Sequence, residues 1–196
     1  MRGQPAKILT DGDLRQILKV VRHRRYPERN RVMILLSVKA GLRACEIAHL
    51  TWPMITDAHG KVGTMLELPA RAAKKGSGRR VPIHPDLRTA LTTLKRTSRG
   101  HRGSNTAPVI RSERNGPMTA KAVVDWFRSV FREVGLEGCS SHSGRRTFVT
   151  KAARLIHQAG GSLRDVQELV GHRSIKTTQG YIERDHDAQR RLIGLL

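Results

Sequence analysis

The sequence predicts an α+β protein that is mostly helical and contains one small antiparallel sheet. Apolar residues recur at intervals of three and four in several separate stretches, the spacing of one buried helix face. Between residues 52 and 83 this pattern gives way to short apolar runs separated by Pro53, Gly60 and Gly63, which is typical of short strands joined by turns. At 196 residues the chain has the length of one domain, so we expect a single domain over residues 1–196.

Two helices are expected before residue 42. Residues 10–13, Thr-Asp-Gly-Asp, have the composition of a helix N-cap. The apolar residues of the helix that follows share one face and are Leu14, Ile17, Leu18 and Val21. A second, more apolar helix covers residues 31–40 and ends at Gly41, the residue type expected at a helix C-terminus. Its composition predicts a central position in the fold.

A small sheet is expected next, followed by helices to the end of the chain. Residues 64–68 and 80–83 are predicted strands, with a turn at residues 74–78 between them. Helical periodicity returns over residues 85–95 and 119–134, and the intervening residues 97–117 are rich in Gly, Ser, Asn, Arg and Pro, which predicts a loop. Two later helical segments are predicted. One begins at Ser162 and ends at Gly171, and the other covers residues 174–179.

The charge of the chain points to nucleic acid as its partner. Lys and Arg number 37 against 16 Asp and Glu, so the formal net charge is +21, which suits binding to a phosphate backbone. A ribosomal-type or merely solubilised basic domain would share this charge. A hydrophobic content of 38% with periodic apolar runs indicates a packed core, so we favour a folded domain that binds nucleic acid.

Cysteine content and hydropathy indicate the cellular compartment in which the protein is expected. Cys45 and Cys139 are the only cysteines, which implies no disulfide framework and favours a reduced, cytoplasmic protein. Residues 1–7 lack the apolar segment of a secretion signal, and no window approaches the roughly 18 apolar residues of a membrane span. We expect no membrane association.

Four short motifs occur in the order and spacing of a known family. They are Ala-Gly-Leu-Arg-Ala-Cys-Glu-Ile at 40–47, Lys-Lys-Gly-Ser-Gly-Arg-Arg-Val-Pro at 74–82, His-Ser-Gly-Arg-Arg-Thr at 142–147, and the segment 169–181, in which Leu-Val-Gly-His precedes a tyrosine. The chain resembles the tyrosine recombinase (phage integrase) family over about residues 8–185. The resemblance implies the catalytic-domain fold of that family. The family's N-terminal DNA-clamping (core-binding) domain has no counterpart here, so we expect similarity to its short, single-domain members.

Two arginines are the candidate phosphate clamp. A phosphodiester undergoing substitution gathers negative charge on its equatorial oxygens, and planar guanidinium groups match those oxygens bidentately. Arg43 and Arg145 lie inside matched motifs and are assigned this role, whereas Arg146 would point elsewhere on a helix and is taken as structural or phosphate-positioning. Glu46 lies one helical turn after Arg43, where it would either hold that guanidinium or form an ordinary surface ion pair.

Tyr181 is the candidate nucleophile. It follows His172 by nine residues within a matched motif, whereas Tyr26, the only other tyrosine, has no motif and is predicted to lie in the core. A free phenol has a pKa near 10, so attack requires nearby cations and proton acceptors. By the resemblance, attack leaves a 3′-phosphotyrosyl link and a free 5′-hydroxyl. The ester retains the bond energy, so we expect no ATP, no metal and no other cofactor.

Proton transfer is assigned to a lysine and two histidines. In the family pattern Lys-x-Gly-x-x-Arg-x-Val-Pro the first lysine is the general acid, which selects Lys74 over the neighbouring Lys75. His142 and His172 are candidates for proton transfer and for donation to the phosphate. The remaining histidines are taken as ordinary core or surface residues. A zinc site from Cys139 and His142 with Cys45 or His172 lacks a second ligand pair, so we predict no metal site.

The predicted activity is site-specific DNA recombination, as integration, excision or inversion. A type IB topoisomerase would use a similar residue set without paired sites, and a non-catalytic DNA-binding regulator would not need Tyr181. The resemblance implies double-stranded DNA and further protomers as partners, with a tetramer in the synaptic complex and accessory DNA-binding proteins as further candidates. Residues 187–196 end in Leu-Ile-Gly-Leu-Leu after two arginines; this apolar tail packs either on its own domain or on a neighbouring protomer.

Overall fold

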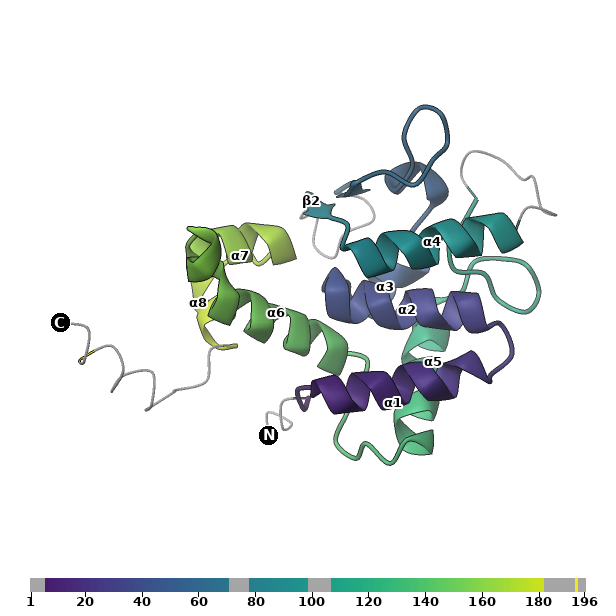
Figure 1. The fold of residues 1–196 in the computed structure, drawn as a ribbon, viewed down its shortest axis with the longest axis horizontal. Helices are drawn as coiled ribbons and strands as arrows, with labels where there is room; N and C mark the ends of the chain where they lie inside the picture. Colours follow the sequence, from purple (N-terminus) through teal and green to yellow (C-terminus); the bar gives the residue numbers. More distant parts are fainter. Residues whose placement is uncertain (1–5, 71–77, 99–106, 182–192, 194–196) are drawn as a thin grey trace.

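A computed structural model describes residues 6–70, 78–98, 107–181 and 193. These residues form a mostly helical fold with a two-stranded antiparallel sheet, so the predicted α+β class is confirmed. Helices α1 to α5 make up most of the molecule, and α6, α7 and α8 lie to one side of it (Figure 1). No helix among the described residues is long and apolar enough to cross a membrane.

The first two helices begin and end where local signals place them. Helix α1 (Asp11–Arg22) opens on a reciprocal cap in which the Thr10 hydroxyl accepts from the Asp13 N–H at 3.1 Å and the Asp13 carboxylate accepts from the Thr10 N–H at 2.8 Å. Helix α2 (Pro27–Lys39) is buried at every position from 32 to 38 and contacts α1, α3, α4 and α6, so its predicted central position is confirmed.

The sheet follows a short helix and a 3₁₀ turn. Helix α3 (Ala44–Ala48) and η1 (Trp52–Met54) precede strands β1 (Met65–Leu68) and β2 (Arg79–Pro82). The strands pair with Leu66 opposite Val81, and both side chains are buried. Glu67 and Arg80 alternate with them and form an exposed ion pair. Residues 71–77, which carry Lys74 and Lys75, lie outside the described residues.

Two further helices complete the main core. Helix α4 (Pro85–Thr97) packs on α2, and helix α5 (Ala120–Glu133) packs on α3 and α1. Thr119 caps α5, and Phe127 and Phe131 on its buried face stack with ring centroids 5.9 Å apart. Of the predicted loop at residues 97–117, Thr97 still belongs to α4, whereas residues 107–117 contain no helix and only isolated bridges.

The C-terminal helices have a small hydrophobic cluster of their own. Helices α6 (Ser143–Leu155) and α7 (Leu163–Val170), with η3 (Ile156–Ala159), pack around Val149, Val166 and Val170. Helix α8 (Ile175–Gln179) packs on α7. Helix α6 joins this cluster to the main core, because Gly144 lies so close to Ser37 of α2 that a Cβ there would overlap the Ser37 side chain. Described residues of the motifs meet at the seam between the two hydrophobic clusters, where Arg145 bonds to the carbonyls of Gly41 and Val170.

The prediction that Tyr26 lies in the core is wrong. Its residue surface is 36% exposed, and the guanidiniums of Arg25 and Arg29 lie 4.9 and 4.6 Å from its ring centroid. Tyr26 is the N-cap of α2 and has a left-handed backbone, with φ of 64°. The turn between α1 and α2 therefore directs an aromatic side chain to the surface, where cations cover it.

Candidate active site

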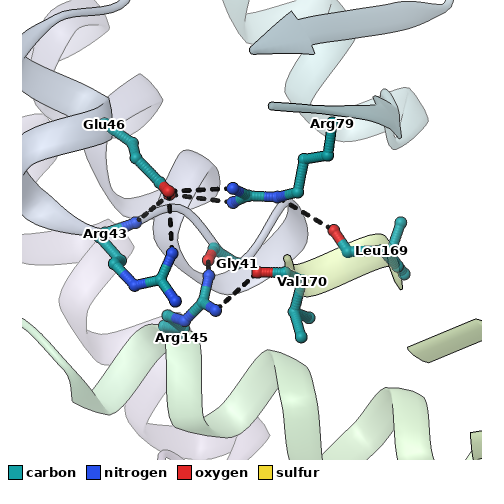
Figure 2. A network of polar contacts seen from close by, with 7 residues as sticks. All are labelled: Gly41, Arg43, Glu46, Arg79, Arg145, Leu169 and Val170. Carbon is teal, nitrogen blue, oxygen red and sulfur yellow. Dashed lines mark hydrogen bonds and ion pairs between the residues drawn. The ribbon is translucent and has the colours of Figure 1, made fainter. Parts of the chain in front are cut away.

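Arg145 is anchored to the ends of two helices. It lies in the first turn of α6 and is buried, with Nη1 donating to the Gly41 carbonyl at 2.5 Å and Nη2 donating to the Val170 carbonyl at 2.7 Å (Figure 2). Both carbonyls are at helix C-termini, where the helix dipole favours a cation. A guanidinium has five N–H groups, and among the described residues the others have no hydrogen-bond partner. Arg145 is thus held in place, and its guanidinium keeps N–H donors that no described residue binds.

Glu46 holds Arg43 in place through hydrogen bonds to its backbone and to its guanidinium. The Glu46 carboxylate accepts from the Arg43 backbone N–H and from Arg43 Nη1, each at 2.9 Å. The carboxylate is fully buried, whereas the Arg43 side chain is 19% exposed. The alternative of an ordinary surface ion pair is therefore wrong. Glu46 therefore fixes an arginine whose side chain is still partly exposed.

Arg79 is the site residue that the sequence reasoning missed. Its Nη1 and Nη2 donate to the two Glu46 oxygens at 2.9 Å each, and its Nε donates to the Leu169 carbonyl at 3.1 Å. Figure 2 shows Glu46 between Arg79 and Arg43. Two signals were available: the family pattern Lys-x-Gly-x-x-Arg-x-Val-Pro has its arginine at this position, and strand alternation puts Arg79 on the buried face with Val81 and Arg80 on the outer face. Arg79 ties strand β2 to both α3 and α7.

The charges of this network set the ionisation of its members. Burial raises the pKa of Glu46, but hydrogen bonds and charge from Arg79, then the N–H and charge of Arg43, outweigh burial and lower that pKa to about 2. Burial and then the charge of Arg43 lower the pKa of Arg145 to about 10. Glu46 is therefore a carboxylate and Arg145 a guanidinium at neutral pH.

His172 is a buried, neutral imidazole next to the arginines. It follows Gly171, whose left-handed φ of 64° ends α7. Burial, and then the charges of Arg145, Arg43 and Arg79, lower the pKa of His172 to about 4. Its Nδ1 lies 3.0 Å from the Thr178 hydroxyl. At neutral pH His172 therefore carries a single ring N–H.

Tyr181 packs against His172. The two rings are stacked with centroids 5.4 Å apart and planes 24° apart. The Tyr181 N–H donates to the Thr178 carbonyl at 3.0 Å, and its carbonyl accepts from the Thr150 hydroxyl at 3.2 Å. Tyr181 also acts on the pKa of Arg145, in the raising direction, so the phenol lies within electrostatic reach of that arginine.

The structure thus brings together four of the six predicted site residues, namely Arg43, Arg145, His172 and Tyr181. His142 is exposed at the N-cap of α6, three residues before Arg145. Lys74 lies outside the described residues. A hollow of about 580 Å³ lies between β2 and the end of α7, with Arg79 and His172 in its wall. Among the described residues no group of three His, Cys, Asp or Glu side chains could hold a metal ion.

Sequence comparisons match most of the chain to one family. The family model of the phage integrase family matches residues 7–188. The tyrosine recombinase XerC of Xylella fastidiosa (strain M23) is 30% identical over 158 residues, covering 80% of this chain and 49% of that protein. XerA of Pyrococcus furiosus is 28% identical over 177 residues, covering 89% of this chain and 56% of that protein. The chain spans about half the length of these curated relatives.

Solved structures with the same fold cover the whole chain. The crystal structure of XerA recombinase superposes with a TM-score of 0.76 at 19% identity and covers 100% of this chain and 66% of that chain. The Tn1549 transposon integrase, in complex with transposon right end DNA, superposes with a TM-score of 0.74 at 18% identity and covers 100% of this chain and 67% of that chain. The predicted fold, a mostly helical domain with a small antiparallel sheet, is shared with these proteins.

Proposed function

The chain belongs to the phage integrase family, and from this premise we propose that it catalyses site-specific DNA recombination by breaking and rejoining strands through a 3′-phosphotyrosyl intermediate. The observation that carries the proposal is the convergence of Arg43, Arg145, His172 and Tyr181 at the seam between the two hydrophobic clusters. These residues come from three separate stretches of sequence, and their side chains combine two cations, one N–H donor and one phenol.

Arg43 and Arg145 are proposed to bind the non-bridging oxygens of the scissile phosphate. Each has one part of its guanidinium held by protein acceptors and other N–H groups without partners among the described residues. Donors fixed in advance stabilise developing negative charge without having to reorganise during the reaction. The fixed geometry of Arg145, bound at two helix ends, supports its role as the more rigid of the pair.

Tyr181 is proposed to attack the phosphorus through its phenol oxygen. The new bond joins this oxygen to phosphorus, and the bond from phosphorus to the 5′-oxygen breaks, which leaves a 3′-phosphotyrosyl ester and a 5′-hydroxyl. We assign His142 to accept the phenol proton and Lys74 to protonate the leaving 5′-oxygen. His172, as a neutral imidazole, contributes an N–H donor to the phosphate. Attack by a 5′-hydroxyl reverses these steps and rejoins the strand.

Double-stranded DNA is the proposed substrate. The net charge of +21 supports it. Among the similar structures the Tn1549 integrase is bound to transposon DNA and lambda integrase is a dimer on its core site. We extend both properties to this chain and propose that protomers assemble on paired sites, up to a tetramer, with accessory DNA-binding proteins as further partners. Residues 187–196, proposed to pack on a neighbouring protomer, lie outside the described residues except for residue 193, Ile, which is exposed.

The test is covalent capture on nicked suicide DNA drawn from the gene's own genomic surroundings. The parent protein is expected to form an adduct that survives denaturing gels, and excess EDTA should not prevent it. Tyr181→Phe removes only the phenol oxygen, so it should still bind DNA but form no adduct. Tyr26→Phe is the matched control and should form the adduct like the parent. An adduct that persists in Tyr181→Phe, or a strict requirement for Mg²⁺, would refute the assignment.

A further inference from the structure

We propose that Thr178 is a positioning residue whose buried hydroxyl donates a hydrogen bond to Nδ1 of His172 and keeps the ring proton on Nε2. The inference rests on the proposed function in one respect, since the recipient of the Nε2 proton's hydrogen bond is the scissile phosphate. The assignment of the tautomer itself depends only on contacts within the protein. It makes a side chain of α8 responsible for what His172 can offer a ligand.

The first observation is the geometry of the pair. Thr178 Oγ1 lies 3.0 Å from His172 Nδ1, and the two residues are 0% and 8% exposed. Gln167 holds the backbone of the histidine on both sides, because its carbonyl accepts from the His172 N–H at 3.0 Å and its side-chain amide donates to the His172 carbonyl at 2.9 Å. Tyr181 stacks on the face of the ring. The ring is therefore fixed in place with Nδ1 directed at the hydroxyl.

The second observation is that, among the described residues, the Thr178 hydroxyl does not bond to a carbonyl of its own helix, as several helical threonines of this chain do. The hydroxyls of Thr89, Thr92 and Thr97 donate to carbonyls four residues earlier in their own helices, at 2.9 to 3.2 Å. Among the described residues the hydroxyl of Thr178 makes no bond to a carbonyl, and His172 Nδ1 is its hydrogen-bond partner. A buried hydroxyl hydrogen requires an acceptor. Nδ1 serves as that acceptor only when its lone pair is free, which places the ring proton on Nε2.

The opposite tautomer would leave two groups unsatisfied. With the proton on Nδ1, the Thr178 hydroxyl would accept, and its own hydrogen would have no acceptor among the described residues. Nε2 would then present a lone pair, which repels a phosphate oxygen instead of binding it. The charges of Arg145, Arg43 and Arg79, together with burial, keep the imidazole neutral. With only one ring proton available, its location decides whether His172 is a donor or an acceptor.

The decisive measurement is nitrogen-15 NMR of the histidine ring in the full chain without DNA, near neutral pH. The resonances of His172 are assigned from their loss in His172→Gln. The parent should show Nε2 protonated and Nδ1 unprotonated. Thr178→Val keeps the side-chain shape without the hydroxyl and should give a mixture of tautomers, whereas Thr178→Ser should keep the parent pattern. Thr177→Val, at the exposed neighbouring position, is the control and should leave the ring signals unchanged.

Cleavage of suicide DNA provides the second readout. Thr178→Val should slow cleavage about tenfold, the scale of one hydrogen bond, and Thr178→Ser should restore most of the rate. A parent ring with Nδ1 protonated, or a Thr178→Val ring identical to the parent, overturns the proposal. So does a shifted tautomer that leaves cleavage unchanged. If the parent itself cleaves no DNA, the proposed function fails, and the NMR signals still decide what Thr178 does to His172. If Thr178→Val does not fold, the parent's tautomer and Thr178→Ser decide it.

Discussion

Replacing Glu46 by Gln is expected to destabilise the fold strongly. Gln has nearly the shape of a protonated glutamic acid, so Glu46→Gln reproduces the loss of charge without changing the packing. The carboxylate accepts four hydrogen bonds, two from Arg43 and two from Arg79, and is fully buried. Its removal leaves both guanidiniums without their counter-charge, which is the costly way to break a buried ion pair.

The size of the effect follows from the ionisation of Glu46. Its pKa is about 2 in the folded protein against an ordinary value of 4.5. At about 1.4 kcal/mol for each tenfold change in acidity, this difference corresponds to about 3 kcal/mol of folding free energy. Because the folded pKa is the lower one, the stabilisation is present above about pH 4.5. It is lost as the pH falls to about 2, where the parent becomes protonated as well.

Urea unfolding followed by circular dichroism measures this difference. Near neutral pH the parent should exceed Glu46→Gln by about 3 kcal/mol, and the gap should close between about pH 4.5 and 2. Glu67→Gln is the matched control, because Glu67 pairs with Arg80 at 3.2 Å but both side chains are more than 60% exposed. It should cost no more than about 1 kcal/mol. A Glu46→Gln variant within about 1 kcal/mol of the parent, or a gap that does not change with pH, would refute the reasoning.

Two other predictions concern Gly41 and His172. Gly41→Ala should lower the free energy of unfolding by more than the about 1 to 3 kcal/mol of backbone strain alone, because φ is +63° and the new Cβ would also overlap the Phe148 ring. Gly135→Ala is the control, because φ is +68° there but nothing lies within 4 Å of the new Cβ, so it should show the backbone strain alone. Equal losses of unfolding free energy for the two variants in urea would contradict this. His172 should titrate by NMR near pH 4, and since an unfolded histidine has a pKa of about 6.5, its contribution to stability should be lost as pH falls from 6.5 to 4. A midpoint near 6.5 would contradict the burial of the ring among guanidiniums.

Features encoded by neighbouring residues could be predicted from the sequence. Helix α1 begins at its Thr10 cap, α2 ends before Gly41 and α7 ends at Gly171, because each signal acts through backbone groups a few residues away. The alternation of residues 79–82 likewise indicates that Arg79 faces the core, although a basic side chain on a strand is usually expected to face solvent.

Features that depend on how segments pack, or on the path of a particular turn, could not be predicted in this way. Glu46 and Arg79 are 33 residues apart, so the burial of that carboxylate depends on where β2 packs. The prediction that Tyr26 lies in the core was wrong because the exposure of this residue is set by a left-handed turn and by two neighbouring arginines, and not by its hydrophobicity. The contact of His172 with Thr178 requires the turn from α7 into α8 to return the chain on itself. Motifs thus predicted the candidate reacting groups but not the side chains that orient them.

The anchoring of Arg145 on main-chain carbonyls has a consequence for how such a site diverges. Its acceptors at residues 41 and 170 are backbone oxygens, which every amino acid supplies. A substitution at position 170 can change the apolar contact of that side chain without removing the acceptor. The hydrogen bond at that position therefore depends on where the helix ends, whereas the side chain of the residue serves the packing of the cluster. The anchor of Arg145 can therefore persist when the residue that supplies the carbonyl changes, provided that the helix still ends at the same place.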